Sequence, residues 1–367
     1  VTGVQTCALP IWSAQVFPTK AQILNWFPLF RSLAASSTRE MTKESPTQLT
    51  TSKNGCGELS NLIIHRDRSE TNAKRRSIAK DGIGSLHVVL DFDHTVTAYI
   101  SPITGEKCPQ CHDAVQHGAY DPPKRRNSFK STIDAIWSDQ DNGKLRHLSE
   151  WWIRFHDAIV SHELTISEIR TAVASSSITL RPGAADLFAW LRENSVKTTI
   201  LSAGIITVIE EVLKRDGIEL HEQACIVSNV PVSDGEEGRI ISFQEPLVHA
   251  LNKEEVLKTL DFGSETMGQP PDNVVLAGNS IGDVQCLPGI HHKRSLSLGF
   301  LHENVDVNIQ VEEGSEICAR SMMTADGSVG APNNPDREII KFPLVDKKDS
   351  NLEEFLKNYE FLRISKF

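Results

Sequence analysis

The sequence has no excess of basic residues. Its 38 Lys and Arg residues are outnumbered by 48 Asp and Glu residues, which gives a net charge of −10. Proteins that bind nucleic-acid polymers concentrate Lys and Arg against the phosphate backbone. This composition therefore argues against a nucleic-acid polymer as the partner, although a few local groups could still hold a small anionic substrate.

Long hydrophobic runs are also missing. No apolar stretch reaches the roughly 18 residues that a membrane-spanning helix needs, so we expect no contact with a membrane. The seven Cys residues are odd in number and scattered over 367 residues. Such spacing is not a disulfide framework and fits a reducing compartment. We therefore expect a cytoplasmic protein, with enough apolar residues (39%) for a sizeable core.

Residues 1–75 are expected to form a leader outside the folded core. Residues 1–12 have no initiating Met and look like translated sequencing adapter. The stretch that follows, to Arg39, has basic residues, Ser and Thr but no acids. Two interpretations of residues 13–40 stay open: an organellar transit segment, or untranslated leader with Met41 as the true start. Residues 41–76 are rich in Ser, Thr, Asn and charge, which predicts disorder.

The stretch Leu86–Thr95 is the most informative part of the chain. Five mostly apolar residues predict a buried strand, and the strand ends at Asp91, Asp93 and Thr95. On an extended backbone residues i and i+2 point to the same side, so the two carboxylates should converge. Open α/β sheets bind ligands at this end of their strands. Two such carboxylates repel each other unless a cation or a proton lies between them.

Helical and strand patterns alternate from residue 184 onward, with a hairpin turn at Asp234-Gly235. Alternation with short connections predicts an α/β fold with a doubly wound, parallel, Rossmann-like sheet. Residues 98–180, with a helical pattern over 148–173, look like a mostly helical insertion after the first strand. The predicted helices are 184–193, 205–215, 252–260 and, in the tail, 352–362; the predicted strands are 196–201, 224–228, 273–277 and, as the last, 295–298.

Three further polar stretches follow predicted strands. Ser202-Ala203-Gly204 opens a helix, where a hydroxyl and free N–H groups can hold a phosphate or simply cap the helix. Lys253 starts a helix, where a cation opposes the dipole unless it has an anionic partner; a solvent-facing Lys is the alternative. Asn279 and Asp283 carry oxygen atoms that suit Mg²⁺, or they cap a helix.

The segment Cys108-Pro109-Gln110-Cys111-His112 has the form of a c-type haem attachment site. Haem attachment needs an export signal, and a zinc site needs a second pair of ligands; neither is visible in the sequence. We expect these side chains to be packed at the base of a hairpin.

The order of these motifs is more specific than any one of them. Asp-x-Asp-x-Thr, then Ser, then Lys, then Gly-Asn-x-x-x-Asp, each after a predicted strand, resembles the haloacid dehalogenase superfamily. The closer resemblance is to the cytosolic 5'-nucleotidase III (pyrimidine 5'-nucleotidase) family, and it runs from about Leu86 to about Leu301. That family carries the Cys-Pro-x-Cys-His segment without haem. The other similar segments are 105–112, 150–152, 201–205, 210–212, 249–253, 276–278 and 295–301.

The resemblance implies a core of the haloacid dehalogenase type (76–97 and 181–367) and a helical cap (98–180). It implies a Mg²⁺-dependent 5'-nucleotidase that hydrolyses nucleoside monophosphates, pyrimidines preferred. We expect a monomer, although nothing in the sequence reveals the oligomeric state. Asp91 would be the nucleophile and Asp93 the general acid and base. The implied substrate-binding residues are Ser202, Ala203, Lys253, Glu150 and Trp137, and the implied Mg²⁺ ligands are Asp91, the carbonyl of Asp93, Asn279 and Asp283.

The sequence departs from the family pattern at two positions. Asn279 stands where the family has Asp, which removes one negative charge from the metal site and should lower Mg²⁺ affinity. Trp137 aligns with a cap carboxylate that reads the base, so Asp134 or Asp139 would have to replace it, and Trp137 or Trp151 could stack on the base. Two alternatives therefore stay open: a phosphatase acting on another small phosphate, and a catalytically weak phosphate-binding regulatory protein.

Overall fold

The computed structural model describes residues 62–65, 68–145, 147, 149–260, 271–302, 316–318 and 358–364. An eight-stranded sheet forms its centre, with strand order β4-β3-β2-β7-β8-β10-β1-β9. Neighbouring strands are parallel from β4 to β10, whereas β1 runs antiparallel to β10. The strands are β1 (Leu62–His65), β2 (Leu86–Leu90), β3 (Lys197–Ile205), β4 (Ala224–Asn229), β7 (Asn273–Gly278), β8 (Arg294–Leu301), β9 (Glu316–Cys318) and β10 (Phe361–Ile364).

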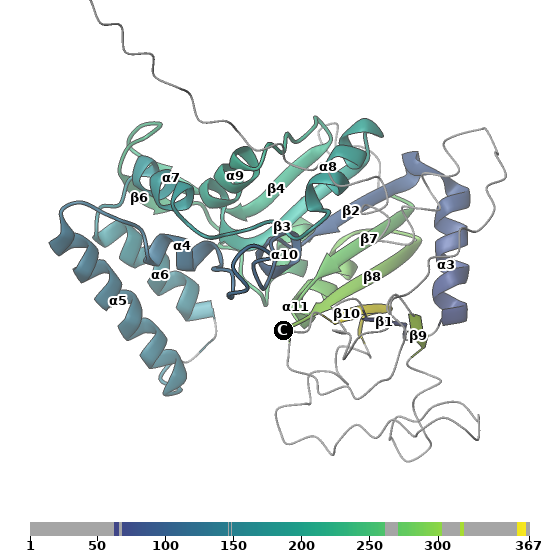
Figure 1. Ribbon diagram of the computed structural model, residues 1–367, viewed down its shortest axis with the longest axis horizontal. Helices are drawn as coiled ribbons and strands as arrows, with labels where there is room; N and C mark the ends of the chain where they lie inside the picture. Colours follow the sequence, from purple (N-terminus) through teal and green to yellow (C-terminus); the bar gives the residue numbers. More distant parts are fainter. Residues whose placement is uncertain are drawn as a thin grey trace, which may run out of the picture.

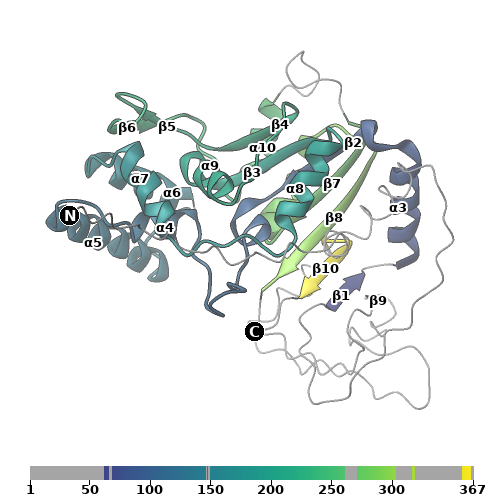
Figure 2. The same cartoon turned by 45° about the horizontal axis from the view of Figure 1, so that its top comes forward.

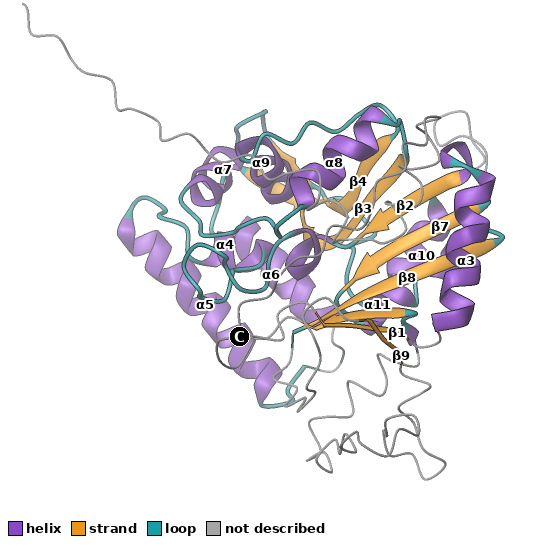
Figure 3. Ribbon diagram, turned by 45° about the vertical axis from the view of Figure 1, so that its right-hand side comes forward, coloured by secondary structure: helices purple, strands orange, loops and turns teal. Residues whose placement is uncertain are grey.

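Helices cover both faces of this sheet, as a parallel sheet requires. Figure 3 shows α3 on the near side of the strands and α10 on the far side. All five residues of β2 and all six of β7 are buried, which explains their continuous apolar sequences. The predicted doubly wound α/β fold is confirmed in this part of the chain. The helices around the sheet are α3 (Arg68–Asp81), α8 (Ala184–Glu193), α9 (Ile206–Arg215), α10 (Lys253–Thr259) and α11 (Ile281–Val284), with short helical turns η1 (Ile83–Ser85), η2 (Phe92–Val96) and η3 (Leu287–Gly289).

The residues between β2 and α8 form a separate group of helices. Figure 1 shows them together on one side of the sheet, with α3 at the opposite end. The predicted helical region therefore contains more helix than its pattern indicated, because the polar stretch after Asp121 is itself a long helix with a buried stripe. These helices are α4 (Cys111–Gln116), α5 (Pro123–Asp141), α6 (Ser149–Ser161) and α7 (Ile166–Ala174).

A small hairpin joins this helical group from a distant part of the sequence. β5 (Pro231–Ser233) and β6 (Ile240–Phe243) pair antiparallel around the predicted Asp234-Gly235 turn. Ile240 donates its N–H to Leu164 O at 2.8 Å, and the ring of Phe243 stacks on His156 at 4.1 Å. Figure 2 shows the hairpin on the same side of the molecule as α4–α7.

Both ends of the described chain differ from the sequence-based expectation. Residues 62–65 and 68–75 were assigned to a disordered leader, but they form β1 and the start of α3; residues 1–61 lie outside the described residues. β8 was expected to be the last strand, yet β9 and β10 follow it. The predicted final helix is also wrong at its end, because residues 361–362 belong to β10; residues 352–357 lie outside the described residues.

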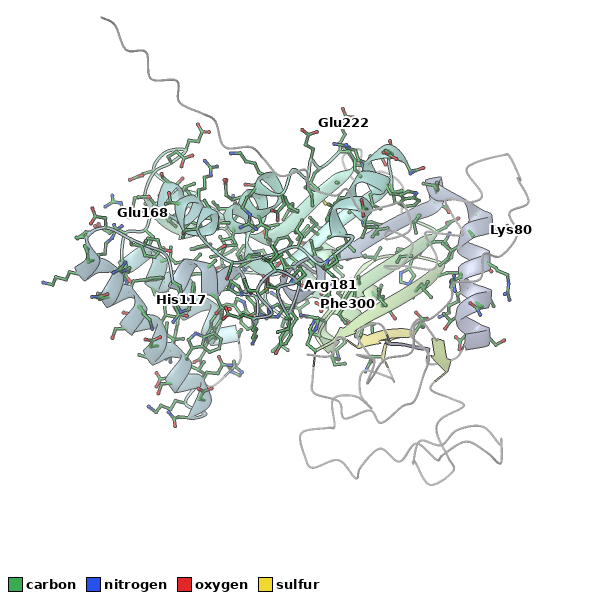
Figure 4. All side chains as sticks on the ribbon, viewed as in Figure 1. Lys80, His117, Glu168, Arg181, Glu222 and Phe300 are labelled. Atoms are coloured by element: carbon green, nitrogen blue, oxygen red, sulfur yellow. The ribbon has the colours of Figure 1, made fainter. Side chains whose placement is uncertain are left out.

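The two chain segments that enter and leave the helical group lie side by side. Thr97 and Leu180 form an antiparallel bridge, and the next residue, Arg181, donates to the carbonyls of His94 (2.5 Å) and Thr95 (2.8 Å). The Arg181 guanidinium lies 3.9 Å from the ring centre of Phe300 on β8, and Figure 4 shows these two side chains together at the centre of the molecule. The insertion is thus fastened to the sheet at its base. No helix in the described ranges is long and apolar enough to cross a membrane.

The helical group contains a buried, neutral histidine that should make the fold sensitive to acid. Neither ring nitrogen of His156 has a hydrogen-bond partner, and burial lowers its pKa to about 3. The unfolded chain takes up a proton near the ordinary value of 6.5, whereas the folded chain does not until about 3. The contribution of His156 to stability is therefore fully present above pH 6.5 and is lost as the pH decreases through this window, by about 1.4 kcal/mol per pH unit.

His156→Phe should consequently make the free energy of unfolding less dependent on pH between 6.5 and 4, by the slope that one proton contributes. Denaturant unfolding at a series of pH values measures that slope. His117→Gln is the control, since His117 is exposed and its loss should leave the slope unchanged. An equal slope in His156→Phe and the parent protein would contradict the prediction.

Candidate active site

Lys253 lies at the centre of the predicted site. Its Nζ atom is 2.7 Å from Asp91 Oδ1, 2.6 Å from Asp283 Oδ1 and 3.1 Å from the carbonyl oxygen of Leu201. The three side chains are almost completely buried. The structure thus brings residues that are about 190 positions apart in the sequence into one cluster, where β2 and β7 end beside Leu201 of β3.

The charges of this cluster alter one another's protonation. Burial raises the pKa of Asp91 to about 7, the nearby Asp283 adds to that rise, and Lys253 opposes it. Burial alone would lower the pKa of Lys253, but the ion pairs with Asp283 and Asp91 raise it above its usual range. Lys253 therefore stays charged, and Asp91 titrates close to neutral pH.

Asp93 is held by the first helix of the insertion. Cys111, at the start of α4, donates its N–H to Asp93 Oδ1 at 2.9 Å. Burial raises the pKa of Asp93 to about 6, and the hydrogen bonds from Cys111 limit the rise. A carboxylic acid with a pKa near 6 can both donate and accept a proton at physiological pH.

The turn after β2 directs Asp91 and Asp93 toward the cluster. The five residues of η2 form one wide turn, in which His94 has left-handed backbone angles (φ 59°). That conformation is unfavourable for a residue with a side chain. Hydrogen bonds stabilise it: the N–H of His94 donates to Thr97 Oγ1 at 2.7 Å, and its carbonyl accepts from Arg181 and His302.

The loop from Asn279 to Asp283 completes the site. Asp283 Oδ2 accepts hydrogen bonds from the N–H groups of Asn279 (3.0 Å) and Ser280 (2.8 Å) and from Ser280 Oγ (2.8 Å). A Cβ atom on Gly278 would lie 2.4 Å from that of Asp283, so only glycine allows this approach. Asn279 Nδ2 donates to the carbonyl of Asp93 at 2.9 Å.

These groups suit a magnesium ion in their chemistry. The Asp91 carboxylate, the Asp93 carbonyl and the Asn279 side chain offer hard oxygen ligands. Asp283, the fourth expected ligand, has both carboxylate oxygens already bound, one by Lys253 and one by the loop. The Asn279 amide already meets the Asp93 carbonyl, and a half-turn of the amide would bring its oxygen to the same place. Within the described ranges no group of three or more His, Cys, Asp or Glu side chains is arranged to hold a metal ion.

The predicted substrate-binding residues are divided between two places. Ser202 lies beside the cluster, and its Oγ accepts the N–H of Gly204 at 3.0 Å. The prediction that residues 202–204 open a helix is wrong, because β3 continues to Ile205 and α9 begins only at Ile206. The carbonyl of Ala203 accepts from Asn229 at 2.8 Å. Trp137 and Glu150 lie in the helical group: the Trp137 indole donates to Gln116 Oε1 at 3.3 Å, and Glu150 pairs with Arg154 at 3.6 Å.

The aromatic side chains near Trp137 form the interior of the helical group. The centre of the Trp151 ring lies 4.7 Å from that of Trp137 and 5.3 Å from that of Trp152. Trp151 is buried, whereas Trp137 and Trp152 are only partly buried. Asp134 accepts a hydrogen bond from Gln116 and pairs with Lys130. Asp139 pairs with Lys144 and Arg154.

The Cys-Pro-Gln-Cys-His side chains point in different directions. Cys111 packs against Gly204, while the ring of His112 packs against Trp151 and Phe155 at 5.0 and 4.7 Å. The side chains of Cys108, Cys111 and His112 are all buried, as expected for packing residues. Their most direct connection to the site is the Cys111 N–H bond to Asp93, which no side-chain pattern could have shown.

Comparison with known proteins identifies the family. A protein-family model described as pyrimidine 5'-nucleotidase (UMPH-1) matches residues 94–313, more than half of the chain. The chain belongs to this family. It is thus a phosphoric monoester hydrolase of the 5'-nucleotidase type, as its motifs predicted. The match begins one residue after Asp93, so the roles of Asp91 and Asp93 depend on the sequence pattern and the geometry.

Individual relatives are similar over most of their length. The 7-methylguanosine phosphate-specific 5'-nucleotidase A of Xenopus laevis is 26% identical over 249 residues, which cover 66% of this chain and 84% of that protein. The human enzyme of the same name is 26% identical over 238 residues, or 63% and 77% of the two chains. A crystal structure of cytosolic 5'-nucleotidase IIIB bound to cytidine aligns with a TM-score of 0.59 at 20% identity, covering 82% of this chain and 87% of that one, and supports the fold.

The contact between Gly204 and Cys111 gives a steric prediction. A Cβ atom on Gly204 would lie 2.7 Å from Cys111 Sγ and 3.0 Å from Cys111 Cβ, so α4 would have to move away from β3. Gly204→Ala should lower the free energy of unfolding by about 1–3 kcal/mol, as measured by denaturant titration. Gly84→Ala is the matched control, because nothing lies within 4 Å of its added methyl group. Equal stability of the two variants would refute the steric argument.

Proposed function

We propose that this protein is a cytoplasmic, Mg²⁺-dependent 5'-nucleotidase that converts a nucleoside 5'-monophosphate into nucleoside and phosphate. The observation that carries this proposal is the buried Lys253 ammonium between Asp91 and Asp283, with Asp93 beside it at the same strand ends. A cation in this place lowers the electrostatic cost of bringing a phosphate dianion to two carboxylates. The family and its relatives support the reaction class.

The reaction would proceed in two displacements at phosphorus. A carboxylate oxygen of Asp91 attacks the phosphorus atom, the bond to the 5'-oxygen breaks, and Asp93 gives that oxygen its proton. Asp93 then takes a proton from a water molecule, whose oxygen attacks the aspartyl-phosphate and releases phosphate. Asp91 is regenerated, and Asp93 ends with the proton that it began with.

The neighbouring groups would hold the phosphate in place. Lys253 provides a fixed positive charge. The Oγ atom of Ser202 accepts the N–H of Gly204, and the hydroxyl proton of Ser202 can be donated to the phosphate. Mg²⁺ bound by the Asp91 carboxylate, the Asp93 carbonyl and Asn279 would neutralise the negative charge that the phosphate brings. Asp283 supports this arrangement through Lys253 and the loop amides.

We propose that residues 98–180 form the cap over this site and that the base binds against it. The partly exposed rings of Trp137 and Trp152 offer surfaces on which a base can stack. The acids that could replace the cap carboxylate, Asp134 and Asp139, both have cationic partners. The family is named for pyrimidine nucleotides and the relatives for 7-methylguanosine phosphate, so the substrate could carry either kind of base.

The function is tested by phosphate release from uridine, cytidine, 7-methylguanosine and adenosine 5'-monophosphates, each with and without Mg²⁺. Asp91→Asn should reduce release at least a thousandfold, because an amide does not act as the nucleophile. Asp141→Asn is the control, since it changes an exposed carboxylate of the helical group and should retain activity. Full activity in Asp91→Asn would overturn the mechanism. No release by the parent protein would favour a phosphate-binding regulatory role.

The amide at Asn279 leads to a separate prediction about the metal. Asn279→Asp adds a negative charge to the proposed ligand set, so Mg²⁺ should bind roughly tenfold more tightly or better. Isothermal titration with Mg²⁺ alone measures this without any substrate. Asn142→Asp adds the same charge at an exposed position of the helical group and should leave the affinity unchanged. An equal gain in both variants would show that net charge, rather than ligation, is responsible.

A further inference from the structure

The loop that carries Asn279 and Asp283 is contacted by Tyr359, which lies just before strand β10. The side chain of Tyr359 is completely buried, and its hydroxyl donates to the carbonyl of Ser280 at 2.6 Å. Ser280 is the residue whose N–H and hydroxyl both bind Asp283 Oδ2. One residue therefore faces Asp283 on one side and Tyr359 on the other.

Tyr359 is itself fixed by the residue that follows it. Glu360 Oε2 accepts the N–H of Ser297 (2.6 Å) and its hydroxyl (3.1 Å), and the N–H of Glu360 donates back to Ser297 Oγ at 3.2 Å. Lys74 on α3 forms an ion pair with Glu360. Strand β10 then pairs with both β8 and β1. The phenol is thus anchored to the sheet and to an N-terminal helix.

The hydroxyl of Tyr359 keeps its proton at neutral pH and therefore acts as a hydrogen-bond donor. Burial and the negative charges of Asp283 and Asp91 raise the pKa of Tyr359 well above its usual range. The carbonyl of Ser280 also accepts the N–H of Asp283, at 3.2 Å. Removing the phenolic hydroxyl would leave this carbonyl with only that longer bond, which weakens the support of the loop.

We propose that Tyr359 is a positioning residue for the proposed active site, acting through Ser280 on the Asn279–Asp283 loop. The segment that performs this task lies outside residues 94–313, which match the family. The loop in turn sets the positions of the Asn279 amide at Asp93 and of Asp283 at Lys253. The segment that leads into the last described strand, β10, therefore belongs to the machinery of the site. The catalytic part of this inference depends on the proposed function, whereas the loop contact does not.

The test compares Tyr359→Phe with Tyr120→Phe in the full chain. Tyr120 is a matched control, because it is also a buried tyrosine whose hydroxyl donates to a backbone carbonyl, that of Val115 in the helical group. Hydrogen exchange, followed by mass spectrometry of peptides over 278–284, reports on the amides of Asn279 and Ser280. We expect about tenfold faster exchange of these amides in Tyr359→Phe and no change there in Tyr120→Phe.

Unchanged exchange in Tyr359→Phe, or equal acceleration in both variants, would overturn the proposal, since equal acceleration indicates general destabilisation. If Tyr359→Phe folds poorly, Ser297→Ala provides a second arm: it weakens the anchor of Glu360 but retains the phenol, and a smaller increase at 278–284 is expected. No increase there would count against the proposal.

Phosphate release provides the activity arm. Tyr359→Phe should lower kcat about tenfold with little change in KM, because the loop supports Asp91 and Lys253 rather than the cap. If the parent protein releases no phosphate, the proposed function fails while the exchange result still decides the role of Tyr359. A Tyr359→Phe variant with altered exchange and unchanged kcat would remove the loop's link to catalysis.

Discussion

The buried ammonium of Lys253 is the interaction on which the rest of the structure depends. Its three N–H bonds are all used, two by the carboxylates of Asp91 and Asp283 and one by the Leu201 carbonyl. Burying such charges costs several kcal/mol per ion unless each is paired and hydrogen-bonded. The pairing holds only if the ends of β2 and β7 lie level with Leu201 of β3, beside the start of α10. A buried lysine at the start of a helix, unfavourable in isolation, is explained by these two carboxylates.

The sequence predicted much of this site because the information is local. An apolar strand followed by Asp91 and Asp93, and a glycine-rich turn at Gly278, determine where side chains point without reference to the rest of the chain. The alternation of helices and strands then places the strand ends together. For the same reason the central strands and α8–α10 were found within a few residues, whereas long-range partners such as Arg181 for the His94 turn were not.

The elements that the sequence did not predict were missed for physical reasons too. The segment 68–75 is mostly polar and charged, and the apolar run in 62–65 is very short. The order of both depends on partners far away in the sequence: β1 pairs with β10, and Lys74 pairs with Glu360. The end of the chain has apolar residues at spacings that fit either a helix or a strand, and the open edge of β8 decides in favour of a strand. The helix α5 was hidden because only a narrow stripe of it, Phe129, Ile133 and Ile136, is buried.

The helical group and the chemistry of Asp93 are coupled through Cys111 at the start of α4. Part of the burial that raises the pKa of Asp93 and the Cys111 hydrogen bond that limits the rise both come from the start of α4. The base of this group is fixed to the sheet by Arg181, so a movement of its helices would act mainly at α4 and the aromatic interior. Displacing α4 would expose Asp93 to water and remove its N–H donor together. A displacement of the helical group should therefore change the protonation of the proposed acid, and a change in its protonation should in turn affect the position of the helical group.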